Sequence, residues 1–264
     1  MQTIRYGSSV DHEADLYLPA APRPAVVCLL HGGFWRMPYG RDQMAAVADD
    51  LVSRGFAVWN LEYRRLGGPG AGWPGTLDDV VAGIDHLAQL VAEGIDLDLD
   101  RVTVVGHSAG GHLALCVAGA HSPRVRVHAA AGLAPVADLP RAYQLKVGGE
   151  VVRELLGGTP GQYPERYQAA SPMAMLPLRV RQLILHGTAD DVVPIDLSRR
   201  YGRAAEAAGD TVEVIELSGT GHMEYLDPRS LAHATLCRWL SAQEASGRRL
   251  NALTRREGAG RLRE

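Results

Sequence analysis

Residues 102–110 read VTVVGHSAG, and the helix-forming stretch GHLALCVAGA follows at residues 111–120. The apolar run at 102–105 predicts a buried strand, and residues 109–120 predict a helix. Ser108 therefore stands at a tight turn, with Gly106 and Gly110 on either side. Glycines let neighbouring backbone pass there, and the hydroxyl projects above the sheet at a helix N-terminus. The segment predicts a nucleophile elbow; the alternative is a serine that only caps the helix.

The rest of the chain alternates short apolar runs with helical stretches, which predicts an α/β fold. The expected strands lie at 14–18, 25–30, 56–61, 102–105, 127–133, 182–185 and 212–217. The expected helices lie at 41–53, 76–91, 109–120, 196–208 and 228–242, and Thr76 with Asp79 resembles a capping box. Continuous apolar strands predict a mostly parallel central sheet with helices on both faces, and residues 14–18 fit an antiparallel edge.

Glycines and prolines interrupt this alternation at residues 138–175, which predicts a short helical insert beside a pocket. We expect a single domain over residues 1–243, with the insert as a partial cap. Residues 244–264 contain six arginines and three glutamates and are expected to form a basic C-terminal tail.

Composition excludes several classes of protein. The formal net charge of −3 does not favour a nucleic-acid surface, and no apolar run is long enough to cross a bilayer. The N-terminus carries no apolar block of the kind found in a signal peptide. The three cysteines, Cys28, Cys116 and Cys237, lie in apolar segments, so buried free thiols in a reducing compartment are expected. We therefore expect a cytoplasmic protein that binds neither nucleic acid nor membrane; whether it forms a homodimer stays open.

A serine nucleophile needs a base and an acid that orients the base. His222 follows a glycine-rich turn after the last expected strand, and it should share the carboxyl edge of the sheet with Ser108. The acid candidates are Asp190 and Asp191 after the strand at 182–185, with Asp138 as a third option.

Other histidines receive lesser roles. His107 and His112 flank the elbow and are expected to orient or pack. The remaining candidates are interpreted as surface or boundary residues: His86, His121, His128 and His233.

Backbone N–H groups must also face the oxyanion that forms during acyl transfer. The stretch HGGFW at residues 31–35 follows a predicted strand, and its Gly-Gly turn exposes such groups; Ala109 offers another. A plain turn is the alternative for the two glycines.

Together these motifs resemble the α/β-hydrolase fold, in its branch of small serine esterases with kynurenine-formamidase-like and hormone-sensitive-lipase-like members. The resemblance covers roughly residues 10–243. Its marks are DLYLP (15–19), HGGFW (31–35), EYRRL (62–66), WPGTLDDV (73–80), GHSAGGHLA (106–114), HGTADDVVP (186–194) and GTGH (219–222).

The resemblance implies roles for the catalytic residues and for the oxyanion donors. Ser108 would be the nucleophile, Asp190 the acid and His222 the base. Asp190 is chosen over Asp191 because the family's loop pattern HGxxDxxVP selects the first aspartate. The oxyanion donors would be the N–H groups of Gly33, Phe34 and Ala109. Phe34 departs from the third glycine of hormone-sensitive-lipase-like relatives and narrows the adjacent space.

These expectations define a metal-free serine hydrolase without a cofactor, which cleaves small-acyl carboxylic esters. An arylformamidase acting on N-formylkynurenine-like amides is the alternative; a small peptidase or a non-catalytic ligand-binding protein is favoured less. The expected substrate pocket is lined by Trp35, Trp73, Tyr143 and Met223.

Overall fold

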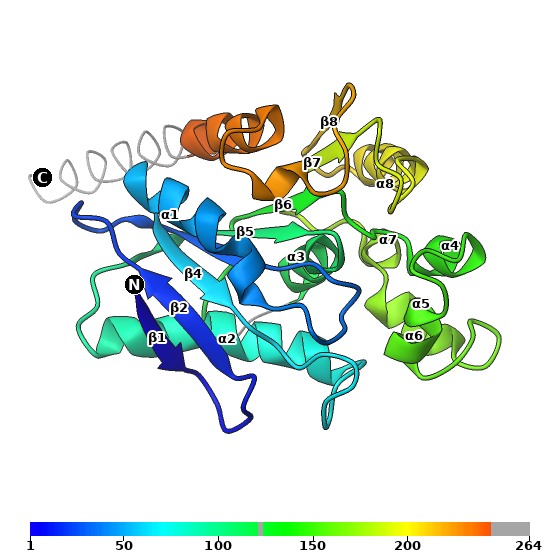
Figure 1. Cartoon of the computed structure of the whole chain (residues 1–264), viewed down its shortest axis with the longest axis horizontal. Coiled ribbons are helices and arrows are strands. Elements are labelled where there is room, and N and C mark those ends of the chain that lie inside the picture. Colours follow the sequence, from blue (N-terminus) through cyan, green and yellow to red (C-terminus); the bar gives the residue numbers. More distant parts are fainter. Residues whose placement is uncertain (121–123, 244–264) are drawn as a thin grey trace, which may run out of the picture.

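The central sheet contains eight strands within the described residues of the computed structural model, which are 1–120 and 124–243 (Figure 1). Their bounds are β1 Gln2–Arg5, β2 Glu13–Tyr17, β3 Ala25–Leu30, β4 Ala57–Leu61, β5 Asp98–His107, β6 Ala129–Leu133, β7 Arg181–Gly187 and β8 Val212–Leu217. The order across the sheet is β1-β2-β4-β3-β5-β6-β7-β8. The pairs β1–β2 and β2–β4 are antiparallel and the others are parallel. The sheet is therefore mostly parallel with an antiparallel edge, as the sequence predicts.

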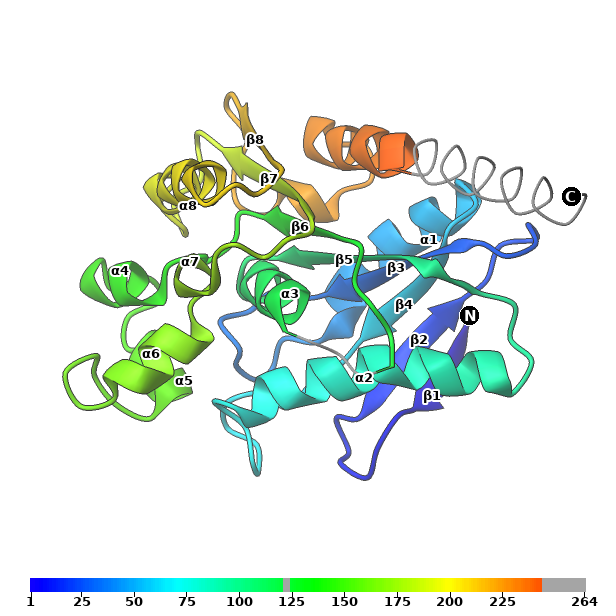
Figure 2. The same cartoon turned by 180° about the vertical axis from the view of Figure 1, so that it is seen from behind.

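Helices cover both faces of this sheet (Figures 1 and 2). Helices α2 (Gly75–Ala92), α3 (Ala109–Gly119) and α8 (Asp196–Ala207) pack on one face. Helix α1 (Ala45–Ser53), preceded by the short helix η1 (Arg41–Met44), and the helix at residues 231–243 pack on the other. A short helix η2 (Glu224–Leu226) follows the last strand.

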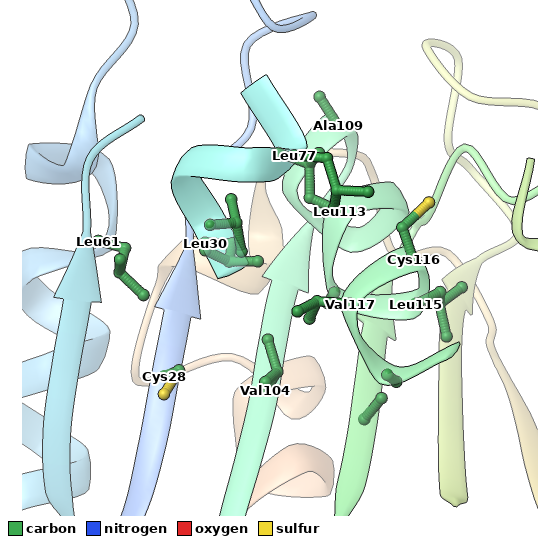
Figure 3. Packing of buried hydrophobic residues seen from close by; sticks show 14 of the residues in the cluster. Cys28, Leu30, Leu61, Leu77, Val104, Ala109, Leu113, Leu115, Cys116 and Val117 are labelled. Atoms are coloured by element: carbon green, nitrogen blue, oxygen red, sulfur yellow. The ribbon is translucent and has the colours of Figure 1, made fainter. Parts of the chain in front are cut away.

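Strand β3 explains why both faces are apolar. All six of its residues are buried, and alternate side chains enter opposite cores: Val26, Cys28 and Leu30 on one face, Ala25, Val27 and Leu29 on the other. Figure 3 shows Cys28 and Leu30 in the layer where Leu113 and Val117 of α3 pack near Val104 of β5. A strand buried on both faces reads as a continuous apolar run, which is why it could be predicted.

The predicted capping box at the start of α2 is wrong. The helix begins at Gly75, and no side chain caps it. Asp79 instead accepts hydrogen bonds from the Arg64 guanidinium and contacts His12 Nε2 at 2.9 Å. The buried carboxylate is drawn to a cation, which stabilises it more than a capping bond to its own helix would.

The insert between β6 and β7 contains four short helices, α4 (Leu139–Gln144), α5 (Val151–Leu156), α6 (Pro164–Ala170) and α7 (Pro172–Met175). It extends to one side of the molecule beyond α3 (Figure 1). Its contacts with the rest of the fold include an ion pair and two hydrogen bonds. Arg36 forms an ion pair with Glu154, the Trp73 N–H donates to the Leu155 carbonyl (2.8 Å), and His112 Nε2 contacts the Ala170 carbonyl (2.8 Å).

The predicted tail at residues 244–264 lies outside the described residues. Within the described ranges, none of the helices has the length and apolarity that a membrane crossing requires.

Candidate active site

Ser108 occupies a strained turn between β5 and α3. Its backbone has φ 55° and ψ −115°, and its N–H donates to the Leu133 carbonyl at the end of β6 (2.8 Å). The flanking glycines are sterically required. A Cβ on Gly106 would lie 2.0 Å from the Gly110 carbonyl oxygen, and one on Gly110 would lie 2.1 Å from the Leu30 oxygen. This turn geometry is the one that the GxSxG spacing predicts.

Asp190 and His222 form a hydrogen-bonded pair at the same edge of the sheet. The His222 Nδ1–H donates to Asp190 Oδ2 (2.7 Å), while Asp190 Oδ1 accepts the N–H groups of Val192 (3.0 Å) and Val193 (2.9 Å). Burial raises the pKa of Asp190, but the hydrogen bonds from His186, His222 and the Val193 N–H outweigh it. The pKa of Asp190 therefore lies well below its usual range, and the group is a carboxylate.

The loops that carry these two residues approach each other closely. The Ala189 N–H donates to the Thr220 carbonyl (3.1 Å), and a Cβ on Gly187 would lie 2.0 Å from that same oxygen. The glycine in the HG pair at residues 186–187 therefore allows the acid loop to pack against the base loop.

His107 connects the base to the elbow. Its Nε2–H donates to the His222 carbonyl (2.8 Å), and the two imidazole rings are 4.6 Å apart at their centroids. Burial lowers the pKa of His107 to about 3, so the ring stays neutral and Nε2 carries the hydrogen. Because Ser108 is the next residue, this bond fixes the backbone of the base relative to the nucleophile candidate. His107 was expected from the sequence only to orient or pack.

Ser108 itself is 2% exposed and His222 is 8% exposed. Within the described part of the chain, no hydrogen bond joins the Ser108 hydroxyl to His222. Catalytic hydrogen bonds are often long without substrate and shorten in the complex, so Ser108 and His222 stay the candidates for nucleophile and base.

The loop after β3 adopts an unusual backbone. Gly33, Phe34 and Trp35 have φ values of 100°, 56° and 55°, three successive left-handed residues. For the two aromatic residues this conformation costs roughly 1–3 kcal/mol each. A Cβ on Gly32 would lie 3.2 Å from Ser108 Cβ, which places the loop against the elbow. Strain of this kind gathers at functional sites, and the loop is the one predicted to hold the oxyanion.

A buried network holds this loop. His31 Nδ1 lies 2.7 Å from the Gly32 carbonyl, and His31 Nε2 lies 2.7 Å from Glu62 Oε1. The Tyr63 ring stacks on the imidazole at 4.3 Å. The Gly32 carbonyl and the Gly33 N–H belong to one planar peptide and point in opposite directions. Because His31 Nδ1 fixes the direction of the Gly32 carbonyl, the Gly33 N–H points away from the His31 ring. In the sequence, Glu62 was evident only as part of the EYRRL motif at residues 62–66.

The remaining acid candidates lie elsewhere. Asp138 caps α4 by accepting the Arg141 N–H (3.0 Å), and Asp191 is exposed. The interpretation of His233 as a surface or boundary residue is wrong, since it is 1% exposed. His86 and His128 are partly buried, and His121 lies outside the described residues.

The predicted pocket residues differ in how much surface they offer. Trp35 is 1% exposed and meets His112 edge-on at 5.1 Å, whereas Met223 beside the base is 59% exposed. Trp73 and Tyr143 are partly buried, and Tyr143 lies edge-on to Tyr167 at 6.1 Å. Phe34 lies against the insert, because a Cβ on Gly148 would come within 2.5 Å of its ring. The pocket assignment stays a prediction, and Trp35 has the least surface to contribute.

The solved structures that resemble this architecture include esterases, and this chain has the α/β-hydrolase fold. The thermophilic esterase Est2 of Thermogutta terrifontis superposes with a TM-score of 0.73 and 25% identity, over 91% of this chain and 90% of Est2. The butyrate-bound structure of Est2 superposes with a TM-score of 0.71 and 25% identity, over 96% of this chain and 94% of Est2.

Residues 14–203 match the BD-FAE family, and the chain belongs to that family of α/β-hydrolase esterases. A curated relative, esterase LipQ of Mycobacterium tuberculosis, is 28% identical over 218 residues, which are 76% of this chain and 50% of LipQ. Esterase LipC of the same organism is 26% identical over 83% of this chain and 58% of LipC. The chain thus spans about half the length of the curated relatives it matches.

Proposed function

We propose that this chain is a serine esterase that hydrolyses small-acyl carboxylic esters through an acyl-enzyme on Ser108. The observation that carries the proposal is the buried Asp190–His222 hydrogen bond of 2.7 Å, with His107 linking His222 to the elbow. The carboxylate selects the tautomer of His222 that keeps its proton on Nδ1, which leaves Nε2 free to accept a proton.

The reaction has two halves. His222 Nε2 takes the hydroxyl proton as Ser108 Oγ attacks the ester carbonyl, and the N–H groups of Gly33, Phe34 and Ala109 bind the oxyanion. The tetrahedral intermediate collapses, the C–O bond to the alcohol breaks, and His222 gives its proton to the leaving alkoxide. Water then attacks the acyl-enzyme with His222 as base, and the carboxylic acid leaves. Each oxyanion donor is worth roughly 3 kcal/mol of barrier.

The preference for a short acyl group is supported by Phe34. Its ring packs against Gly148 of the insert, and its own N–H is one of the proposed oxyanion donors. The similar esterase Est2 has been solved with butyrate bound, which agrees with a small acyl pocket. The named relatives are esterases and lend no support to the formamidase alternative.

A cytoplasmic location is part of the same proposal. All three cysteines are buried and free, as expected for a protein in a reducing compartment. The proposed partner is a small-molecule ester, without nucleic acid or membrane.

The test is kcat/KM for p-nitrophenyl acetate, butyrate and decanoate and for N-formylkynurenine on one preparation. The kcat/KM for the butyrate ester should exceed that for the decanoate ester by about tenfold or more, because a few methylene groups that do not fit the pocket already lower kcat/KM by that factor. Phe34→Ala keeps the Cβ but removes the ring, so it should raise decanoate relative to butyrate. If the wild type has a higher kcat/KM for decanoate than for butyrate, the proposed small acyl pocket is wrong. If its kcat/KM for N-formylkynurenine exceeds that for butyrate, the formamidase alternative holds instead.

A further inference from the structure

Asp50, His233 and Cys237 form a compact cluster away from the residues proposed for catalysis. Asp50 lies on α1, and the other two lie one turn apart on the helix at residues 231–243. His233 and Cys237 are 1% and 3% exposed, and the Asp50 side chain is 24% exposed. The cluster therefore joins two helices that are distant in sequence and pack on the same face of the sheet.

Three ligand-type atoms meet in this cluster. His233 Nε2 lies 2.6 Å from Asp50 Oδ2 and 3.2 Å from Cys237 Sγ, and Sγ lies 3.8 Å from the same Oδ2. Hydrogen bonding uses this arrangement incompletely. The single hydrogen on His233 Nε2 is donated to Asp50 Oδ2. Cys237 Sγ then has only its long contact to Oδ2 and a contact to Nε2, whose one hydrogen is already used. His233 Nδ1 is buried without a partner, so Nε2 makes all the polar contacts of this ring among the described residues.

The three distances fit a bound ion. They define a triangle with a point about 2.1 Å from all three atoms, roughly 1 Å outside its plane, and zinc–ligand bonds are about 2.0–2.3 Å long. Opening the short Nε2–Oδ2 edge by less than about 1 Å gives near-tetrahedral angles. A thiolate, an imidazole and a carboxylate form a donor set typical of zinc, and the exposed side of Asp50 leaves room for a water as fourth ligand.

We propose that Asp50, His233 and Cys237 bind one zinc-like divalent ion, which clips the helix at residues 231–243 to α1. The ion is separate from the metal-free hydrolytic step: none of its ligands is assigned to that step. The two negative ligands would balance the charge of the ion. It would stabilise the folded chain, because the unfolded chain does not hold these three residues together.

Arg54 competes with such an ion. Its guanidinium contacts both Asp50 oxygens, at 2.6 and 3.3 Å, and its side chain is 44% exposed. An exposed arginine can turn into solvent at small cost, since a surface ion pair of this kind contributes little stability. Removing it should therefore favour the ion and not abolish the site.

The chain contains a matched control at His112 and Cys116. These residues have the same spacing on α3 and an Sγ–Nε2 distance of 3.4 Å, but their third partner is the Ala170 carbonyl, 2.8 Å from Nε2. A neutral carbonyl oxygen replaces the carboxylate, and both side chains are fully buried. This pair should not bind a divalent ion.

The experiment is titration of chelator-treated full-length protein with Co²⁺ under anaerobic conditions. A thiolate-to-cobalt charge-transfer band should appear, saturate at one ion per chain and disappear when Zn²⁺ is added. Cys237→Ala should lose the band and Cys116→Ala should keep it. Zn²⁺ should raise the Tm of the wild type and of Cys116→Ala but not that of Cys237→Ala. A folded wild type without the band, or a band that persists in Cys237→Ala, overturns the proposal.

Two further variants keep the test decisive if Cys237→Ala does not fold. His233→Asn retains the thiol but removes the imidazole, and it should lose or greatly weaken the cobalt band. Arg54→Gln should bind Co²⁺ about two- to fivefold more tightly, because it removes the competing cation. Unchanged or weaker binding by Arg54→Gln would show that the ion does not use Asp50 and would overturn the proposed ligand set.

Discussion

The substitution Asp190→Asn tests the proposed role of the acid. Asp190 Oδ1 already accepts two backbone N–H groups, from Val192 and Val193, so an asparagine at this position must keep its carbonyl oxygen there. Its NH₂ group then replaces Oδ2, which faces His222 Nδ1 at 2.7 Å. Two donors cannot face each other, so the proton of His222 moves to Nε2. That tautomer cannot take a proton from Ser108.

The expected cost is large and specific. Stabilising the wrong tautomer of a triad histidine lowers kcat by about 10³–10⁴-fold, which corresponds to about 4–5.5 kcal/mol of barrier. The control is Asp191→Asn at the exposed neighbouring position, which should change kcat by about tenfold or less. Both variants are compared by kcat on p-nitrophenyl butyrate, with circular dichroism to confirm folding. Reversed magnitudes would mean that Asp191 is the acid and that the reasoning from the loop geometry is wrong.

Two other predictions concern groups that support the site. The pKa of His107 is lowered to about 3 by burial, so between pH 6.5 and 3 the unfolded chain binds more protons and stability falls as the pH falls. Urea unfolding should be measured from pH 7 to pH 5. The free energy of unfolding should depend less steeply on pH in His107→Gln than in the wild type, by up to about 1.4 kcal/mol per pH unit, and equal slopes would contradict this. Glu62→Gln weakens the contact that holds His31 and through it the Gly33 peptide, so kcat should fall about 10- to 100-fold with little change in KM. A kcat within about twofold of the wild type, or a loss confined to KM, would show that Glu62 does not position the loop.

Much of this architecture could be predicted because parallel strands buried on both faces leave continuous apolar runs. The run at β3 matches the structure to the residue, and the elbow was evident because only glycine fits at positions 106 and 110. The antiparallel edge was also predicted, although β1 had no apolar signal and was not assigned its own range.

The remaining features depend on contacts between residues far apart in the sequence. Asp79 was assigned to a cap because its partners, Arg64 and His12, lie 15 and 67 residues away. The bond from His107 to the His222 carbonyl spans 115 residues, and the burial of His233 against Asp50 spans 183. Local patterns contain no sign of such contacts, since they arise only when distant elements pack on the same sheet.

The central claim is that Ser108 is the nucleophile, and covalent labelling tests it most directly. A serine-directed phosphonate should add once per chain, and peptide mapping should place the adduct on Ser108. This is the serine that the strained turn (φ 55°) and the proposed base His222 should activate. Ser108→Ala should take up no label and should lose nearly all turnover of p-nitrophenyl butyrate while remaining folded. An adduct on another residue, or near-normal turnover by Ser108→Ala, would contradict the account.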